Sequence, residues 1–159
     1  MPADHHRDHH YAVTVRWTGN TGEGTVSYRG YQRANEITAA GRPAIPGSSD
    51  PAFLGDGTGY SPEELLVAAL SQCHMLAYLH MCADSGVVVV SYADDTTGTM
   101  VQTGASGRFT EVMLHPVVTV ADPSMVDKAL AMHDNVHEAC FVASSVNFPV
   151  RCEASVSAA

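Results

Sequence analysis

The sequence predicts an α+β fold in which antiparallel strands pack over a long central helix and a second helix. Apolar and polar residues alternate in residues 11–17, 25–31 and 109–120, which is typical of strands with one buried face. An apolar stretch that follows Ser61 predicts a long helix, and helical spacing after Asp122 predicts another. The predicted order is strands, helix, strands, helix, strand.

The length of 159 residues suits one domain with its own core. We assign residues 11–159 to that domain. Residues 1–10 are polar and carry His5, His6, His9 and His10. They offer too little apolar surface to offset the entropy of ordering, so we predict a disordered, His-rich arm.

The N-terminal part of the domain predicts a small sheet. Residues 11–17 and 25–31 are separated by turn glycines, which predicts a hairpin, and residues 33–39 add a third strand. Residues 41–59 are rich in Gly, Pro, Ser and Asp, which predicts an irregular loop.

The central helix has a strong start signal. Ser61 and Glu64 form a capping box, Pro62 suits the first helical position, and Gly86 is a plausible end. The helix is apolar nearly all round, so we expect it in the middle of the protein. Three N-terminal strands cannot easily cover it, which favours a second copy of the chain.

The C-terminal half predicts more strands and the second helix. Three extended stretches follow the central helix: residues 87–92, 95–102 and 109–120. Pro116 favours a sheet edge or a bulge. The second helix opens at Asp122 and runs to about His137 or Cys140, and residues 146–157 predict a closing strand.

Composition excludes several classes of partner. A net charge of -9 with one lysine argues against nucleic acid, because phosphate binding needs clustered cations. We find no apolar run of about 18–20 residues and no signal peptide, so we expect no membrane association and a cytoplasmic location. Charged residues make up only 16%, which favours a homodimer.

Two of the four cysteines indicate thiol chemistry. Cys73 lies in SQCHM on the central helix, and Cys140 lies in HEACF near the end of the second helix. Taken alone, Cys73 is better explained as a small buried hydrophobe. A second thiol brought opposite it would make a reversible redox couple. Cys82 and Cys152 match no motif, and we interpret them as packing residues.

Two segments resemble a known superfamily. SPEELLVAALSQC resembles the signature of the OsmC/Ohr proteins (osmotically inducible protein C and organic hydroperoxide resistance proteins), with Glu63 ten residues before Cys73. VHEACFVASSVNFPV resembles the motif around the second cysteine of those proteins, and the separation of Cys73 from Cys140 also matches. The resemblance covers most of residues 11–158.

The resemblance implies an OsmC-like intertwined homodimer and a thiol-dependent peroxidase that reduces organic hydroperoxides. Cys73 would be the peroxidatic thiolate and Cys140 the resolving thiol. An external dithiol, for example a lipoylated protein, would restore the pair. No cofactor is implied.

The sequence lacks an arginine at the positions where the superfamily has one. The superfamily holds an arginine against the carboxylate that matches Glu63, but Phe53, Leu54 and the NTGEG turn stand at the expected positions. Arg29, Arg33 and Arg42 remain, of which we favour Arg42, and His74 or His80 could also supply the charge. Phe141 replaces the proline after Cys140. These departures support an alternative: a catalytically weak or inactive relative that binds an apolar ligand.

The position of Glu63 has a geometric consequence. Ten residues of straight helix separate it from Cys73 by about 15 Å. Either the helix begins later than Ser61 predicts, or residues of a second chain complete the pocket.

The histidines allow a third hypothesis, a metal-dependent enzyme. His133, His137 and Cys140 fall on one face of the second helix, and His74 and His80 flank Cys73. Neither CxxC nor HExxH occurs. Our default is therefore polar histidines at a pocket wall, with no metal.

Overall fold

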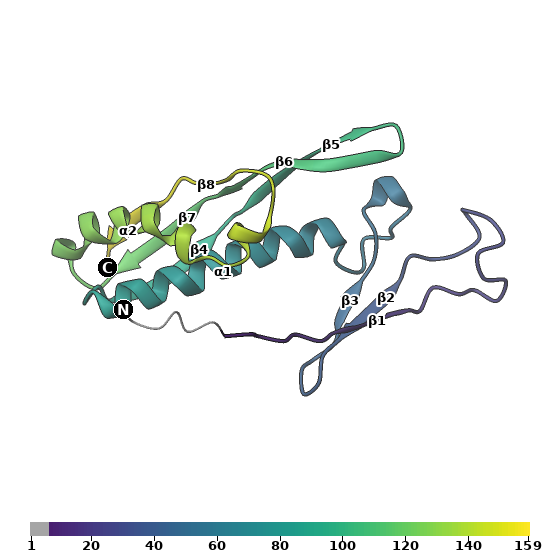
Figure 1. Ribbon diagram of the computed structural model, residues 1–159, viewed down its shortest axis with the longest axis horizontal. Helices are drawn as coiled ribbons and strands as arrows, with labels where there is room; N and C mark the ends of the chain where they lie inside the picture. Colours follow the sequence, from purple (N-terminus) through teal and green to yellow (C-terminus); the bar gives the residue numbers. More distant parts are fainter. Residues whose placement is uncertain (1–6) are drawn as a thin grey trace. The chain divides into compact units, whose positions relative to one another are not determined.

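The computed structural model describes residues 7–159, in which two compact units divide between Glu64 and Leu65 (Figure 1). Residues 7–10 have no regular secondary structure. Part of the predicted His-rich arm, including His5 and His6, lies outside the described residues. Each unit is described by itself below.

The first unit is built on a three-stranded antiparallel sheet in the order β1-β2-β3. Its strands are β1 (Thr14–Trp17), β2 (Asn35–Thr38) and β3 (Ile45–Gly47). Thr14 pairs with Thr38 and Trp17 with Asn35. A 3-10 turn follows at Pro51–Phe53, so the segment predicted as an irregular loop contains a strand and a helical turn.

The predicted hairpin between residues 11–17 and 25–31 is wrong, because β1 pairs with β2 and residues 25–31 form turns. Side-chain hydrogen bonds explain the difference. The Asn20 carbonyl accepts from the amides of Gly22 and Gly24, and Arg33 donates to the carbonyls of Tyr28 and Tyr31. These local bonds satisfy the backbone without a strand ladder.

The helix α1 (Pro62–Asp84) begins and ends where its capping signals predict. The Ser61 amide donates to Glu64 Oε2 at 2.8 Å, and the Glu64 amide donates to Ser61 Oγ at 3.2 Å. Gly86 has a φ of 73°, and the Val87 amide donates to the Cys82 carbonyl at 2.9 Å. This is the Schellman arrangement that ends many helices.

Burial on α1 is confined to one stripe: Leu70, His74, Tyr78 and Cys82. Leu76 is 56% exposed, so the second unit by itself does not cover both sides of the helix. The expectation that no stretch has membrane-spanning character also needs correction. By length and a mean hydropathy of 1.4, α1 could cross a bilayer, although core helices of soluble proteins meet the same criteria.

The second unit contains two three-stranded sheets, β4-β7-β9 and β5-β6-β8. The strands are β4 (Val89–Asp94), β5 (Thr97–Thr103), β6 (Ser106–Leu114), β7 (Pro116–Val120), β8 (Val150–Cys152) and β9 (Ser155–Ala158). The pairs β6–β8 and β7–β9 are parallel and add to the antiparallel pairs that the sequence predicts. Pro116 opens β7 after the break at His115, and the predicted closing strand is two strands in different sheets.

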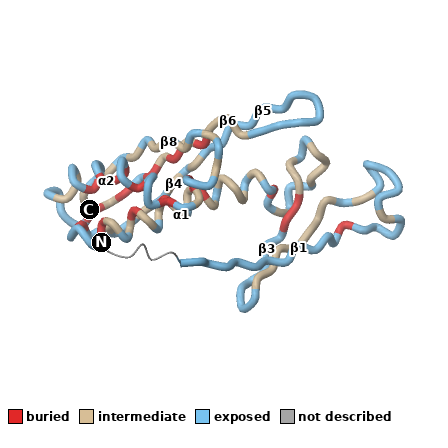
Figure 2. Tube along the Cα trace, viewed as in Figure 1, coloured by how far each residue is buried: buried red, intermediate tan, exposed pale blue. Residues whose placement is uncertain are grey.

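The second helix, α2 (Val126–Ala139), ends directly before Cys140 as predicted. Asp122 caps the 3-10 turn Pro123–Met125 that precedes it. Two apolar clusters join the elements of this unit. One includes Tyr78, Val118 and Val136, and the other includes Leu70, Leu114 and Cys140. In Figure 2 the buried segments of the unit follow α1, α2 and the strands beside them, whereas β5 is exposed.

Candidate active site

The two cysteines singled out by the sequence lie next to each other in the second unit. Cys73 is half-buried on α1, and Cys140 is the residue after α2, with 1% of its surface exposed. Their side chains are hydrogen-bonding neighbours, and both are free thiols. Two helices therefore bring together sulfur atoms that are 67 positions apart in the sequence.

The surroundings of the two thiols are apolar. Cys140 belongs to a buried cluster with Leu70 and Leu114, and Cys73 packs against that cluster. Phe109 and Phe148 pack there too, with ring centroids 5.4 Å apart. Such a lining suits the alkyl tail of an organic molecule better than a small polar one.

Burial determines the protonation state of Cys140. Burial, together with the hydrogen bond to Cys73, raises the pKa of Cys140 to about 11. Cys140 therefore holds its proton at neutral pH.

Glu63 and Arg42 belong to the first unit. Glu63 lies in the first turn of α1, and its Oε2 atom is buried without a hydrogen-bond partner among the described residues. Arg42 is exposed in the turn between β2 and β3. Arg33 contacts the rings of Tyr28 and Tyr31, so it is occupied within this unit.

The structure settles one of the two explanations for the position of Glu63. One continuous helix, beginning at Pro62, carries both Glu63 and Cys73. A later helix start is therefore wrong. Residues from a second chain remain as the other explanation.

The histidines do not supply a cation to Cys73. Burial lowers the pKa of His74, so its imidazole is neutral at pH 7. His80 is exposed and lies 3.2 Å from Asp84. Among the cations of the second unit, Arg151 pairs with Glu111, and Lys128 donates to the Ser85 carbonyl.

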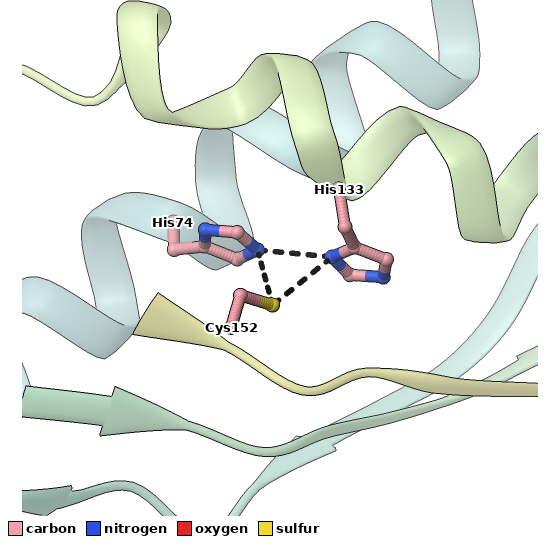
Figure 3. Close-up of side chains that lie close together, drawn as sticks. All are labelled: His74, His133 and Cys152. Atoms are coloured by element: carbon pink, nitrogen blue, oxygen red, sulfur yellow. Dashed lines mark hydrogen bonds between the residues drawn. The ribbon is translucent and has the colours of Figure 1, made fainter. Parts of the chain in front are cut away.

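A second cluster lies beside the thiol pair, where His74, His133 and Cys152 point toward one another (Figure 3). His74 Nε2 is 2.9 Å from His133 Nδ1, and Cys152 Sγ lies 3.8 Å and 3.9 Å from these two atoms. The interpretation of Cys152 as a packing residue is therefore incomplete. Its sequence context holds no signal, because the contact depends on the parallel pairing of β8 with β6.

The sequence placed His133, His137 and Cys140 on one helix face as possible metal ligands, but these three residues do not form the cluster found among the described residues. His133 joins this second cluster, but His137 and Cys140 instead line a cavity of about 30 Å³ beside it. All three residues of the second cluster and four apolar residues complete the lining: Leu70, Leu114, Ala143 and Val150.

Comparison with known proteins identifies the family. The model of the family described as OsmC-like protein matches residues 55–155. The chain belongs to the OsmC family. An OsmC-like protein of unknown function from Vibrio cholerae is 30% identical to it, with a TM-score of 0.82 over 92% of this chain and 99% of that one.

Two more distant OsmC-family structures share the fold. An organic hydroperoxide resistance protein from Legionella pneumophila is 19% identical, with a TM-score of 0.64 over 94% of this chain and 99% of that one. The organic hydroperoxide resistance protein OhrB of Bacillus subtilis is 20% identical, with a TM-score of 0.57 over 92% and 98%. A search of curated proteins found no match. The α+β fold of this OsmC-family chain agrees with the prediction from sequence.

Proposed function

We propose that this protein is a thiol-dependent peroxidase that reduces organic hydroperoxides through Cys73 and Cys140. The contact between the two thiols carries the proposal. It places a second sulfur within reach of the first, which a disulfide cycle requires. Membership of the OsmC family, which includes proteins named for organic hydroperoxide resistance, supports the substrate class.

The cycle has three balanced steps. The Cys73 thiolate attacks one oxygen of ROOH; the O–O bond breaks, and with one proton the products are Cys73 sulfenic acid and ROH. The Cys140 thiol then condenses with the sulfenic acid to give a disulfide and water. An external dithiol reduces that disulfide and is itself oxidised to a disulfide.

The reductant is an external dithiol of low polarity, such as a protein-bound lipoyl group. A reducing compartment such as the cytoplasm would keep this dithiol available. The apolar cluster around Cys73 favours substrates with a hydrocarbon tail over hydrogen peroxide.

The site would be completed in a homodimer. Large apolar side chains are exposed in both units, among them Leu76 on α1 and Val15 on β1. Unpaired apolar surface of this kind is typical of an interface. The unpartnered Oε2 of Glu63 would then bind a cation, and Arg42 is the arginine we favour for that role.

The test is consumption of tert-butyl hydroperoxide by the purified protein with dihydrolipoamide as reductant. Cys73→Ser removes the nucleophile and should lower the rate at least about a hundredfold. Cys82→Ala is the matched control, because Cys82 is also on α1 but is fully buried against Met132. Unchanged consumption in Cys73→Ser would refute the proposal.

The competing hypothesis, an inactive relative that binds an apolar ligand, predicts a different result. Both the natural protein and Cys73→Ser would then leave the hydroperoxide intact. An apolar compound would also remain bound after purification and be released on denaturation.

A further inference from the structure

The proposed disulfide cycle makes no use of the cluster formed by His74, His133 and Cys152. The three side chains come from α1, α2 and the last residue of β8, and their ligand atoms converge (Figure 3). Both histidines are nearly completely buried, with 5% and 6% of their surfaces exposed. Two imidazoles and one thiol converging from three elements form a ligand set typical of transition metals.

The spacing of the three atoms agrees with tetrahedral coordination. For Zn–N bonds of about 2.0 Å and a Zn–S bond of about 2.3 Å, tetrahedral geometry separates two nitrogens by about 3.3 Å and a nitrogen from sulfur by about 3.5 Å. The observed separations are 2.9 Å between nitrogens and 3.8 Å and 3.9 Å from sulfur. Each differs from the ideal value by only a few tenths of an ångström.

Neighbouring side chains hold the ligands in place. The Tyr78 ring stacks on His133 with centroids 3.9 Å apart, and the Tyr78 hydroxyl donates to the Ala129 carbonyl at 3.1 Å. The His133 ring therefore has little freedom to rotate. Such support from outside the ligand set fixes ring orientation in metal sites.

The charge around the cluster suits a cation. Burial lowers the pKa of His74 and lowers that of His133 to about 4, so both imidazoles are neutral and able to bind a metal. The charge of Asp94 acts on all three side chains, and that of Asp134 acts on Cys152. Asp94 is fixed by hydrogen bonds from Ser71 Oγ and the His115 amide.

The second ring nitrogen of His133, Nε2, is not one of the converging atoms. It is buried and has no partner among the described residues. The cavity of about 30 Å³ borders all three side chains, and a water molecule fits in that volume. The cavity therefore offers room for a fourth ligand.

We propose that His74, His133 and Cys152 bind one Zn²⁺ ion, with a water molecule from the adjacent cavity as the fourth ligand. Binding converts the Cys152 thiol to a metal thiolate and releases its proton, while both imidazoles bind as neutral donors. The ion ties α1, α2 and β8 together. It leaves Cys73 and Cys140 free, so this site is independent of the peroxidase proposal.

The test uses Co²⁺ and Zn²⁺ with the full-length, fully reduced chain. The N-terminal histidines can bind metal themselves, so each measurement is made on a full-length background in which four residues are replaced by Gln: His5, His6, His9 and His10. We expect one Co²⁺ per chain, with a thiolate charge-transfer band and the intense visible bands of four-coordinate Co²⁺. Zn²⁺ should displace the Co²⁺. Added to the metal-free protein, Zn²⁺ should release one proton per ion and raise the melting temperature.

Two variants decide the assignment. Cys152→Ser should abolish the charge-transfer band and weaken binding at least about tenfold, whereas Cys73→Ser, which replaces another half-buried thiol, should preserve both. His133→Gln should also weaken binding, and circular dichroism in EDTA checks that each variant is folded. Absence of binding by the four-Gln background, or a charge-transfer band that persists in Cys152→Ser, would overturn the proposal.

Discussion

Cys73 and His74 are consecutive on α1 but belong to different clusters, because successive helical residues point about 100° apart. Cys73 contacts Cys140 at the end of α2, whereas His74 contacts His133 in the middle of α2 and Cys152 on β8. One helix thus presents a thiol to a redox partner and an imidazole to a ligand cluster. The two clusters can be changed separately by mutation.

Cys140→Ser should stop the cycle after its first step. Without the resolving thiol, Cys73 sulfenic acid loses the partner with which it condenses, so it accumulates after one equivalent of tert-butyl hydroperoxide. Dimedone labelling and peptide mass spectrometry measure it. The natural protein, in which Cys140 consumes the sulfenic acid, should show little label. Equal labelling of both proteins would show that Cys140 does not resolve Cys73.

The resolving step should accelerate with pH. Because burial raises the pKa of Cys140 to about 11, its thiolate is a minor species near neutral pH. The thiolate fraction, and with it the rate of disulfide formation, should rise about tenfold per pH unit from pH 7 to 9. Quenched-flow mass spectrometry after one hydroperoxide pulse follows the disulfide. A rate independent of pH over this range would mean that Cys140 does not react as the thiolate.

Leu70→Ala should destabilise the protein strongly. Leu70 is fully buried on α1 among Val112, Leu114 and Cys140, so truncation leaves a cavity that costs about 2–5 kcal/mol of unfolding free energy. Val101→Ala, at an exposed apolar position on β5, should change it by less than about 0.5 kcal/mol. Urea unfolding monitored by circular dichroism measures both. Equal effects would contradict the assigned core.

Leu76→Glu should shift the protein from dimer toward monomer. Leu76 is an exposed apolar residue on α1, a helix that the second unit by itself does not cover on both sides. The control is Leu130→Glu, which places the same charge on an exposed apolar position of α2. Light scattering after size exclusion gives the mass. If Leu76→Glu left the dimer intact, α1 would not be part of the dimer interface.

The sequence predicts those elements whose signals are local. The Ser61–Glu64 capping box marks the start of α1, Gly86 marks its end, and Asp122 marks the approach to α2. The spacing of apolar residues identifies these segments as helices rather than strands. Each of these features depends on residues within one or two turns, so short-range physical chemistry is sufficient.

Long-range pairing could not be predicted in the same way. Residues 25–31 have the alternation of a strand, but hydrogen bonds from Asn20 and Arg33 hold the segment in turns, and β1 pairs with β2 instead. The parallel pairing of β8 with β6 brings Cys152 to His74, which is 78 positions away. Sequence motifs located Cys73 and Cys140, whereas the His74, His133 and Cys152 cluster required tertiary structure.

The most direct test of the redox account is peptide mass spectrometry of the reduced protein after one equivalent of tert-butyl hydroperoxide, without reducing agent in the digest. The account predicts one new linkage, a disulfide between the peptides of Cys73 and Cys140, which dihydrolipoamide reverses. Cys73 recovered unmodified, or linked mainly to Cys82 or Cys152, would contradict it.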